Sequence, residues 1–148
     1  MALTVEDIRV FCKDIPELNI LLEGETQSSD DLITRAIRLT VSDFNSYPPA
    51  TQFSAEDFPS ESTMLFGVQH YLALAEAERQ LRNQVNFAAQ GVNAGIDDKH
   101  PQYLQLAATY RQLFLDKTRE HKVFLNMQQA WGEVYSPYVG INEHHFQN

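Results

Sequence analysis

The sequence of 148 residues has one cysteine, one tryptophan and no long run of apolar residues. One cysteine excludes an intramolecular disulfide and any metal cluster built from the cysteines of a single chain, and it is compatible with a reducing compartment. A bilayer span needs roughly 20 consecutive apolar residues, and no segment approaches that length. The N-terminal stretch MALTVEDIRVFCKD lacks the basic and apolar regions of a signal peptide. We therefore expect neither a membrane protein nor a secreted precursor.

Basic residues are also scarce, since 11 Lys and Arg face 20 Asp and Glu and give a formal net charge of −9. Proteins that grip nucleic-acid phosphates use clustered Lys and Arg, so this class is disfavoured. The acidity is concentrated in residues 1–62, which hold 12 acids and 4 bases, whereas residues 63–148 hold 8 acids and 7 bases. The first half of the chain is expected to present an acidic surface that repels DNA.

The remaining composition is that of an ordinary globular protein, with 43% hydrophobic and 21% charged residues. Such a composition argues against wholesale disorder, and the length is close to the commonest size of a single domain. We predict a mainly α fold, an antiparallel helical bundle over residues 1–134. An extended C-terminal arm over residues 135–148 is expected to follow it.

Start and stop signals predict four helices in the bundle. Thr4, followed by acidic residues, is typical of an N-cap, and Pro16 ends that first helix. The second helix begins at Asp30-Asp31, where acids complement the helix dipole, and Pro48-Pro49 ends it. The third and fourth helices are expected over residues 61 to about 84 and 101–131.

The last of these helices is unusually long. Roughly 30 residues make about 45 Å of helix at 1.5 Å per residue. A chain of 148 residues does not need so long a helix in its core, so part of it is expected to project or to pack on a neighbour. Its apolar stripe also thins after Lys117. The predicted inner face consists of Tyr103, Leu106, Ala107, Tyr110, Leu113, Phe114, Lys117, His121, Phe124, Leu125 and Gln128.

Residues 85–98 interrupt the helical pattern between the two longest helices. Asn and Gly recur there, and apolar residues alternate with polar ones on both sides of Gly91. Alternation around a glycine-containing centre is typical of a β-hairpin, and an extended loop has the same composition. We predict one of these two structures for this segment.

Candidate catalytic and metal-binding residues are few. His144 and His145 follow Glu143, but adjacent residues rarely converge on one ion, and no second cluster stands at ligand spacing. A solvated or interface-bound tail explains them better. His70 and His121 are single histidines within helices, where a structural role is more common than a catalytic one.

The acid pairs Asp30-Asp31 and Asp97-Asp98 stand at predicted helix starts, where capping explains them better than acid–base catalysis. The stretch GVNAG, residues 91–95, lacks the Lys-Ser/Thr of a phosphate loop and the glycine spacing of a dinucleotide fold. We therefore predict that the protein is not an enzyme and uses no cofactor and no metal ion.

The order of these parts, and residues 83–138 in particular, resembles the head–tail connector (adaptor) proteins that lie beneath the portal of tailed bacteriophages. Three stretches carry the resemblance: DDLITRAIRLTVSDFNSYPP, RNQVNFAAQGVNAGIDDKHPQYLQ and AWGEVYSPY. Similar phage proteins have a Gly- and Asn-rich hairpin between two long helices and end in a Gly-x-Val-x-Ser-x-Tyr pattern. That pattern reads WGEVYSPY here, residues 131–138.

The resemblance implies a virion structural protein that forms a ring, usually of twelve subunits, beneath the portal protein. The ring would close the neck and offer a docking platform for the tail or the next neck protein. It would be located in the virion neck and, during assembly, in the host cytoplasm, without a membrane. DNA would pass through the lumen without specific binding, and an acidic lumen suits this role because like charges keep phosphates from sticking.

Two sets of residues are candidate contacts in such an assembly. An irregular arm that carries aromatic residues can order on a partner and anchor there. The arm candidates for contact with the portal are Trp131, Tyr135, Tyr138 and Phe146. The hairpin candidates for contact with a neighbouring subunit or the tail are Phe87, Val92 and Ile96. The alternatives are that Trp131 and Tyr135 fold back on the bundle and that residues 85–98 form a surface loop.

A different class of function also fits the acidity. A small acidic helical regulator could bind a basic partner or mimic nucleic acid. This alternative predicts contiguous carboxylates on one exposed face of the second helix and the loop that precedes it.

Overall fold

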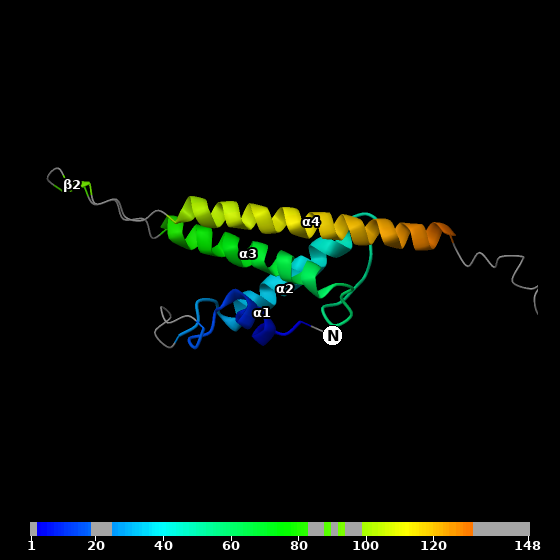
Figure 1. Cartoon of the computed structure of the whole chain (residues 1–148), viewed down its shortest axis with the longest axis horizontal. Helices are drawn as coiled ribbons and strands as arrows, with labels where there is room; N and C mark the ends of the chain where they lie inside the picture. The colour runs from blue at the N-terminus through cyan, green and yellow to red at the C-terminus, as the bar shows by residue number, and fades with distance from the viewer. Residues whose placement is uncertain (1–2, 19–24, 83–87, 90–91, 94–98, 132–148) are drawn as a thin grey trace, which may run out of the picture.

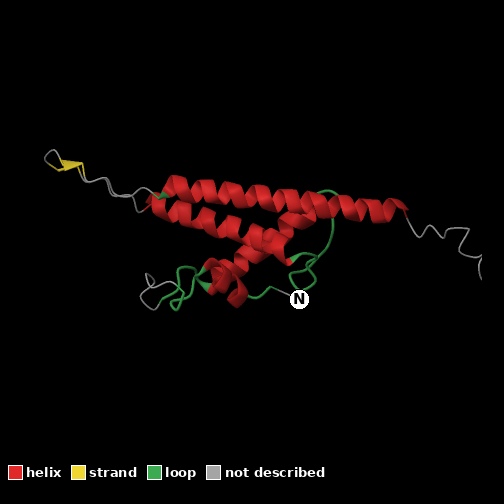
Figure 2. Cartoon of the chain, viewed as in Figure 1, coloured by secondary structure: helices red, strands yellow, loops and turns green. Residues whose placement is uncertain are grey.

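We describe the chain from a computed structural model, which covers residues 3–18, 25–82, 88–89, 92–93 and 99–131 (Figure 1). Within these residues the protein is mainly α, and loops connect the helices (Figure 2). The four helices are α1 (Val5–Cys12), α2 (Asp30–Ser46), α3 (Glu61–Arg82) and α4 (His100–Trp131). α3 and α4 lie side by side, and α2 crosses them (Figure 1). The predicted helical bundle is confirmed.

Two short strands lie between α3 and α4. β1 (Ala88–Ala89) pairs antiparallel with β2 (Val92–Asn93), with Ala89 opposite Val92. The other residues of the predicted hairpin or loop over 85–98 are outside the described residues, and so is the predicted arm over 135–148. Both predictions, and the domain boundary after residue 134, stay predictions.

The predicted helix starts are confirmed by their caps. In a capping box before α1, the Thr4 hydroxyl accepts from the Asp7 N–H at 3.2 Å, and the Asp7 carboxylate accepts from the Thr4 N–H at 2.9 Å. Before α2, Ser29 Oγ accepts from the Leu32 N–H at 3.2 Å. α1 ends at Cys12, earlier than Pro16 indicated, because Lys13 adopts a left-handed conformation with a φ of 55° that closes the helix.

The core lies where α1, α2 and α3 meet. Apolar residues recur there at three- and four-residue spacing along each helix and face one another. The buried cluster consists of Ile8, Ile33, Ala36, Ile37, Met64 and Val68. A second buried centre surrounds Phe44, near the end of α2. The centroid of the Phe44 ring lies 4.8 Å from that of Phe58 and 5.9 Å from that of Phe53.

At Gly67 the backbone of α3 lies close to side chains of both α2 and α4. A Cβ at this position would lie 2.3 Å from Thr40 Cγ2 and 3.0 Å from Phe114 Cδ2. Neither neighbour can yield easily, because both are fully buried and the Thr40 hydroxyl donates to the Ala36 carbonyl oxygen at 2.8 Å. The absence of a side chain at this one position therefore allows three helices to meet.

α3 and α4 are antiparallel, and small residues line their contact. Ala73, Ala77 and Ala107 are all buried there, which lets the two backbones approach. His70 Nδ1 donates to the Ala107 carbonyl oxygen at 2.9 Å, since a carbonyl can only accept. His100 Nδ1 donates in the same way to the Ala77 carbonyl oxygen at 2.8 Å. The structural role predicted for His70 is thereby confirmed.

Asp43 joins α2, α3 and α4 on the other side of this contact. Its carboxylate accepts from the Tyr71 hydroxyl at 2.8 Å and forms an ion pair with Arg111. Burial, together with the hydrogen bond to Asp43, raises the pKa of Tyr71. The Arg111 guanidinium also lies 5.7 Å from the centre of the Phe114 ring. One carboxylate thus receives side chains from two other helices.

The inner face of α4 is rotated from the predicted one. The residues that are buried are Ala107, Phe114, Thr118 and Lys122. Five residues predicted to face inward are exposed: Leu106, Leu113, Lys117, Phe124 and Gln128. The rotation follows from the close approach of α4 to α3, because the contact accommodates Ala107 and Phe114 but not Leu106 and Leu113. Packing at the contact, rather than the hydrophobicity of the row, decides which side faces inward.

We predict that Gly67→Ala destabilises the fold by about 1 kcal/mol. Overpacking of a filled core typically costs about 1–3 kcal/mol, which outweighs the roughly 1 kcal/mol that Ala gains over Gly within a helix. Urea unfolding followed by circular dichroism measures the change. In a Thr40→Ala background, which removes the nearest atoms, the same substitution should cost less. Equal costs in both backgrounds would show that Thr40 does not restrict this position.

Candidate functional site

Most of the predicted contact residues cannot be placed. Trp131 is the last residue of α4, and Val92 is in β2. The others lie outside the described residues: Phe87, Ile96, Tyr135, Tyr138 and Phe146. The two predicted contact surfaces therefore stay predictions, and the candidate site is built from the residues that the structure describes.

The last turns of α4 carry large apolar side chains that no other described element covers. Val123, Phe124 and Met127 are 51%, 55% and 50% exposed. This part of the helix extends past the other described helices (Figure 1), as the length of the helix predicted. We call residues 123–131 the α4 tip. Apolar side chains exposed together in this way are typical of an interaction surface.

A second apolar surface surrounds a cleft of about 340 Å³ between α1, α3, α4 and the residues that precede α2. Phe11 of α1 and Leu106 of α4 stand at its edge, 57% and 41% exposed. Its other apolar or aromatic lining residues include Leu32, Leu72, Ala73, Tyr103 and Tyr110. Cys12 is exposed and lines this cleft.

Gln69 of α3 lines the cleft with a buried amide. The residue is 6% exposed, and its Oε1 accepts no hydrogen bond from any described residue. A buried acceptor without a partner is costly, by about 1–3 kcal/mol. Sequence reasoning missed this residue because Gln69, Ala73 and Glu76 follow one another at helical spacing and are typical of a solvent face.

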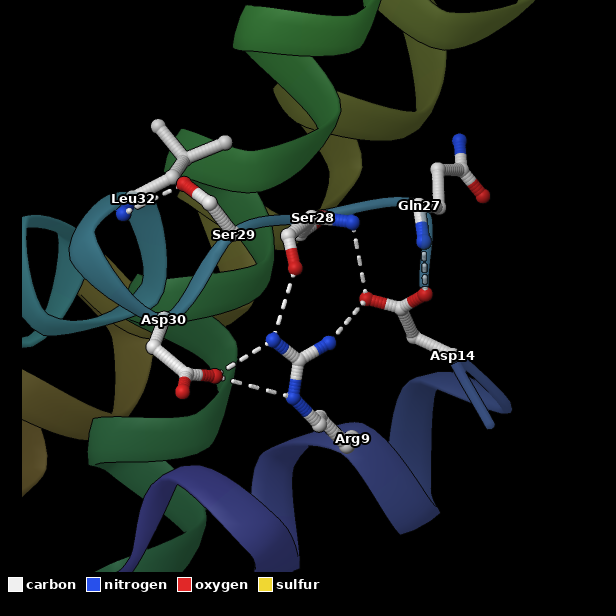
Figure 3. A network of polar contacts seen from close by, with 7 residues as sticks. All are labelled: Arg9, Asp14, Gln27, Ser28, Ser29, Asp30 and Leu32. Carbon is white, nitrogen blue, oxygen red and sulfur yellow. Dashed lines mark hydrogen bonds and ion pairs between the residues drawn. The ribbon is translucent and has the colours of Figure 1, made fainter. Parts of the chain in front are cut away.

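Arg9 fixes one wall of the cleft by joining α1 to the start of α2 (Figure 3). Its Nη1 donates to Asp14 Oδ2 at 2.9 Å, its Nη2 donates to the Ser28 carbonyl oxygen at 2.7 Å, and it also pairs with Asp30. Asp14 in turn accepts from the backbone N–H groups of Ser28 and Gln27. The Arg9 and Asp14 side chains are almost fully buried. We call these residues the Arg9 network.

Glu76 carries the charge on the opposite wall. Burial by itself would raise its pKa, but hydrogen bonds from Gln80 and Arg79 outweigh burial and lower the pKa. The Glu76 carboxylate therefore stays ionised near neutral pH, with Arg79 at 2.8 Å. Acids on both walls thus have basic partners within the chain, so the cleft suits a neutral, largely apolar occupant.

A buried lysine holds the base of the α4 tip. Lys122 is 1% exposed, and its ammonium donates to the Pro49 carbonyl oxygen at 2.8 Å and to Thr51 Oγ1 at 2.7 Å. The same ammonium lies 4.5 Å from the centre of the Phe44 ring, which adds a cation–π contact. Burial lowers the pKa of Lys122. These contacts fix α4 to the loop after α2, one residue before the tip begins.

His121 lies beside Lys122 and also contacts Phe44. The two rings are 5.7 Å apart between centroids, and His121 Nε2 is buried without a hydrogen-bond partner among the described residues. Burial, and secondarily the charge of Lys122, lowers the pKa of His121. The neutral imidazole therefore fits this packing better than the charged one.

The described residues include no group of three His, Cys, Asp or Glu side chains that could hold a metal ion. The pair Asp30-Asp31 lies in the first turn of α2, which confirms the capping interpretation. Asp97-Asp98 and the segment 143–145 are outside the described part of the chain. Among the helices described, none is long and apolar enough to cross a membrane.

The alternative of an acidic regulator predicts contiguous carboxylates on the exposed face of α2. Asp31 is followed on this face by Arg35 and Arg38, and all three are exposed. Asp43, further along, is paired with Arg111. Carboxylates are therefore interrupted by two arginines in the described part of this surface, which weighs against mimicry of nucleic acid.

Comparison with known proteins finds no relative: the sequence matches no protein-family model, no curated protein and no solved structure. The function must therefore be argued from the residues of this chain.

We predict that Arg9→Met destabilises the protein by about 3 kcal/mol, because it leaves Asp14 buried without its cation. The matched control is Arg79→Met, which removes a half-exposed arginine from a helical ion pair and should cost less than about 1 kcal/mol. Urea unfolding measures both. Similar costs would contradict the role of the Arg9 network in holding the wall of the cleft.

The lowered pKa of His121 predicts a loss of stability in mild acid. Below the ordinary value of 6.5 the unfolded chain takes up the proton more readily than the folded one, so the free energy of unfolding falls as the pH decreases. Unfolding measured between pH 7 and pH 5 should show a steeper loss for the natural chain than for His121→Phe, which cannot titrate. Parallel curves would show that another group causes the loss.

Proposed function

We propose that the protein is a virion structural protein, a head–tail connector (adaptor) that assembles as a ring beneath the portal of a tailed bacteriophage. It would close the neck and present a platform for the tail or the next neck protein. DNA would pass through the lumen without specific binding. In this proposal the arm residues Trp131, Tyr135, Tyr138 and Phe146 contact the portal, and the hairpin residues Phe87, Val92 and Ile96 contact a neighbour or the tail.

The observation that carries the proposal is the α4 tip. Phe124 and Met127 lie half exposed on a helix that extends past the bundle and leads directly into the sequence of the arm. A chain that acted alone would gain nothing from leaving these side chains in water, because burial of each is worth about 1.5–3 kcal/mol. The tip and the arm together are therefore suited to association with other chains.

The fold and the charge also support a structural role. Acids that line the cleft are held by partners within the chain, and the partly buried histidines of α3 and α4 take part in packing. These contacts favour a role in binding over a role in catalysis. The excess of acids in residues 1–62 suits a surface near DNA that must not bind it. In a closed ring, weak contacts repeat around the symmetry axis and act together.

We predict that deletion of residues 135–148 leaves the bundle folded and abolishes binding to the portal. Circular dichroism would test the fold, and light scattering of the chain mixed with the portal protein of the same phage would test assembly. A control that removes only Gln147 and Asn148 should still bind. If the deletion unfolds the protein, these residues belong to the core. If the full chain remains monomeric with portal in excess, the connector function is wrong.

A further inference from the structure

The α4 tip and the cleft both expose large apolar side chains. The tip is a convex end of a helix that carries Phe124 and Met127, and the cleft is a recess edged by Phe11 and Leu106. Both are apolar, and both are exposed in the chain as described. If the tip entered the cleft, both apolar surfaces would be buried.

The tip cannot occupy the cleft of its own chain. Leu106 and Met127 belong to the same uninterrupted helix, and 21 residues separate them. At 1.5 Å per residue this separation is about 31 Å. An α4 tip that occupies the cleft must therefore belong to another copy of the chain.

We propose that residues 123–128 of the α4 tip of one copy dock in the cleft of a second copy, so that the chains associate head to tail and Trp131 stays outside the cleft. Such a contact joins different surfaces of the two copies, and it closes into a ring or grows into a filament according to the rotation between neighbours. The proposal deepens the connector function, because it names the surfaces through which ring subunits meet, and in that sense rests on it. The contact itself can be tested without a portal.

The charges of the two surfaces agree with this contact. The tip has the sequence VFLNMQQAW, residues 123–131, which contains no charged residue. The acids that line the cleft, Asp14 and Glu76, already have Arg9 and Arg79 as partners. A neutral helix end can therefore enter without leaving a buried acid unpaired, whereas a charged segment would have to lose its hydration there.

The hydrogen-bonding groups also match. Gln69 Oε1 is a buried acceptor in the cleft without a described donor. The tip exposes the side-chain amides of Asn126 and Gln128, each of which has an NH₂ group that can donate. A donor from the tip would satisfy Gln69, which an occupant made only of hydrocarbon would not.

Cys12 allows a direct test, because it is the only cysteine of the chain and lines the cleft. The natural chain is mixed with a differently tagged Cys12→Ser/Met127→Cys chain under a mild oxidant such as oxidised glutathione. We expect a mixed disulfide between Cys12 of one chain and the thiol at position 127 of the other, identified by mass spectrometry. The matched control is Cys12→Ser/Thr34→Cys, whose new thiol lies on the exposed face of α2 and should not react with Cys12. Absence of the mixed disulfide would overturn the proposal.

The same experiment separates the tip from the C-terminal residues as the occupant. Removal of residues 132–148 from both chains should leave the mixed disulfide at an unchanged yield. Loss of the disulfide would show that those residues, and not the tip, reach the cleft, and the proposal would be wrong.

Self-association measured by sedimentation equilibrium gives a second test. Leu106→Glu and Phe124→Glu should each weaken association at least tenfold. Leu113→Glu is the matched control, because Leu113 is exposed to the same extent on the same helix, 40% against 41% for Leu106, and does not line the cleft. Circular dichroism checks that each variant folds. A natural chain that stays monomeric, or three variants that behave alike, would overturn the contact.

The results for this contact and for the connector function can be told apart. A chain that associates through the tip and the cleft but does not bind the portal keeps this inference and loses the function. If the natural chain binds the portal and the Leu106→Glu variant self-associates as strongly as the natural chain, the connector function stands and the proposed contact is wrong.

Discussion

The close approach of three helices at Gly67 is the constraint on which the rest of the structure depends. Because α3 has no side chain there, Thr40 of α2 and Phe114 of α4 can both contact its backbone region. The contact of Phe114, together with the burial of Ala107, Thr118 and Lys122, defines the rotation of α4, which leaves Leu106 and Phe124 exposed. Both candidate interaction surfaces follow from this rotation.

Charged residues hold together the parts of the chain that the apolar core does not reach. Arg9 joins α1 to the segment before α2, Asp43 joins α2 to Tyr71 and Arg111, and Lys122 holds the loop after α2. In each case a side chain meets several partners, which compensates for the loss of hydration on burial. Among the described residues, the acids that line the cleft, Asp14 and Glu76, therefore have basic partners within the chain.

The head-to-tail contact specifies how the subunits of the proposed connector ring would meet. A ring needs two different surfaces on each subunit, and the α4 tip and the cleft, which Leu106 of α4 lines together with residues of α1 and α3, are two such surfaces. The arm that follows Trp131 would then remain available for a different partner. This contact would also explain why α4 is longer than the bundle requires, because its first half packs against α3 and its end would be presented to a neighbour.

The sequence by itself determined the helices and the starts of α1 and α2, because caps and acids in the first turn act on neighbouring residues. The end of α1 was not predicted, because it depends on the left-handed conformation of Lys13 rather than on Pro16. The sequence also indicated that α4 would project, since length follows from residue count. Only the tertiary structure decided which side of α4 faces inward, because that choice depends on Gly67, which is distant in the chain. The cleft was decided in the same way, since Phe11, Gln69 and Leu106 come together only when three helices pack. Local signals cannot specify such a site, because its geometry arises from contacts between segments that the chain order keeps apart.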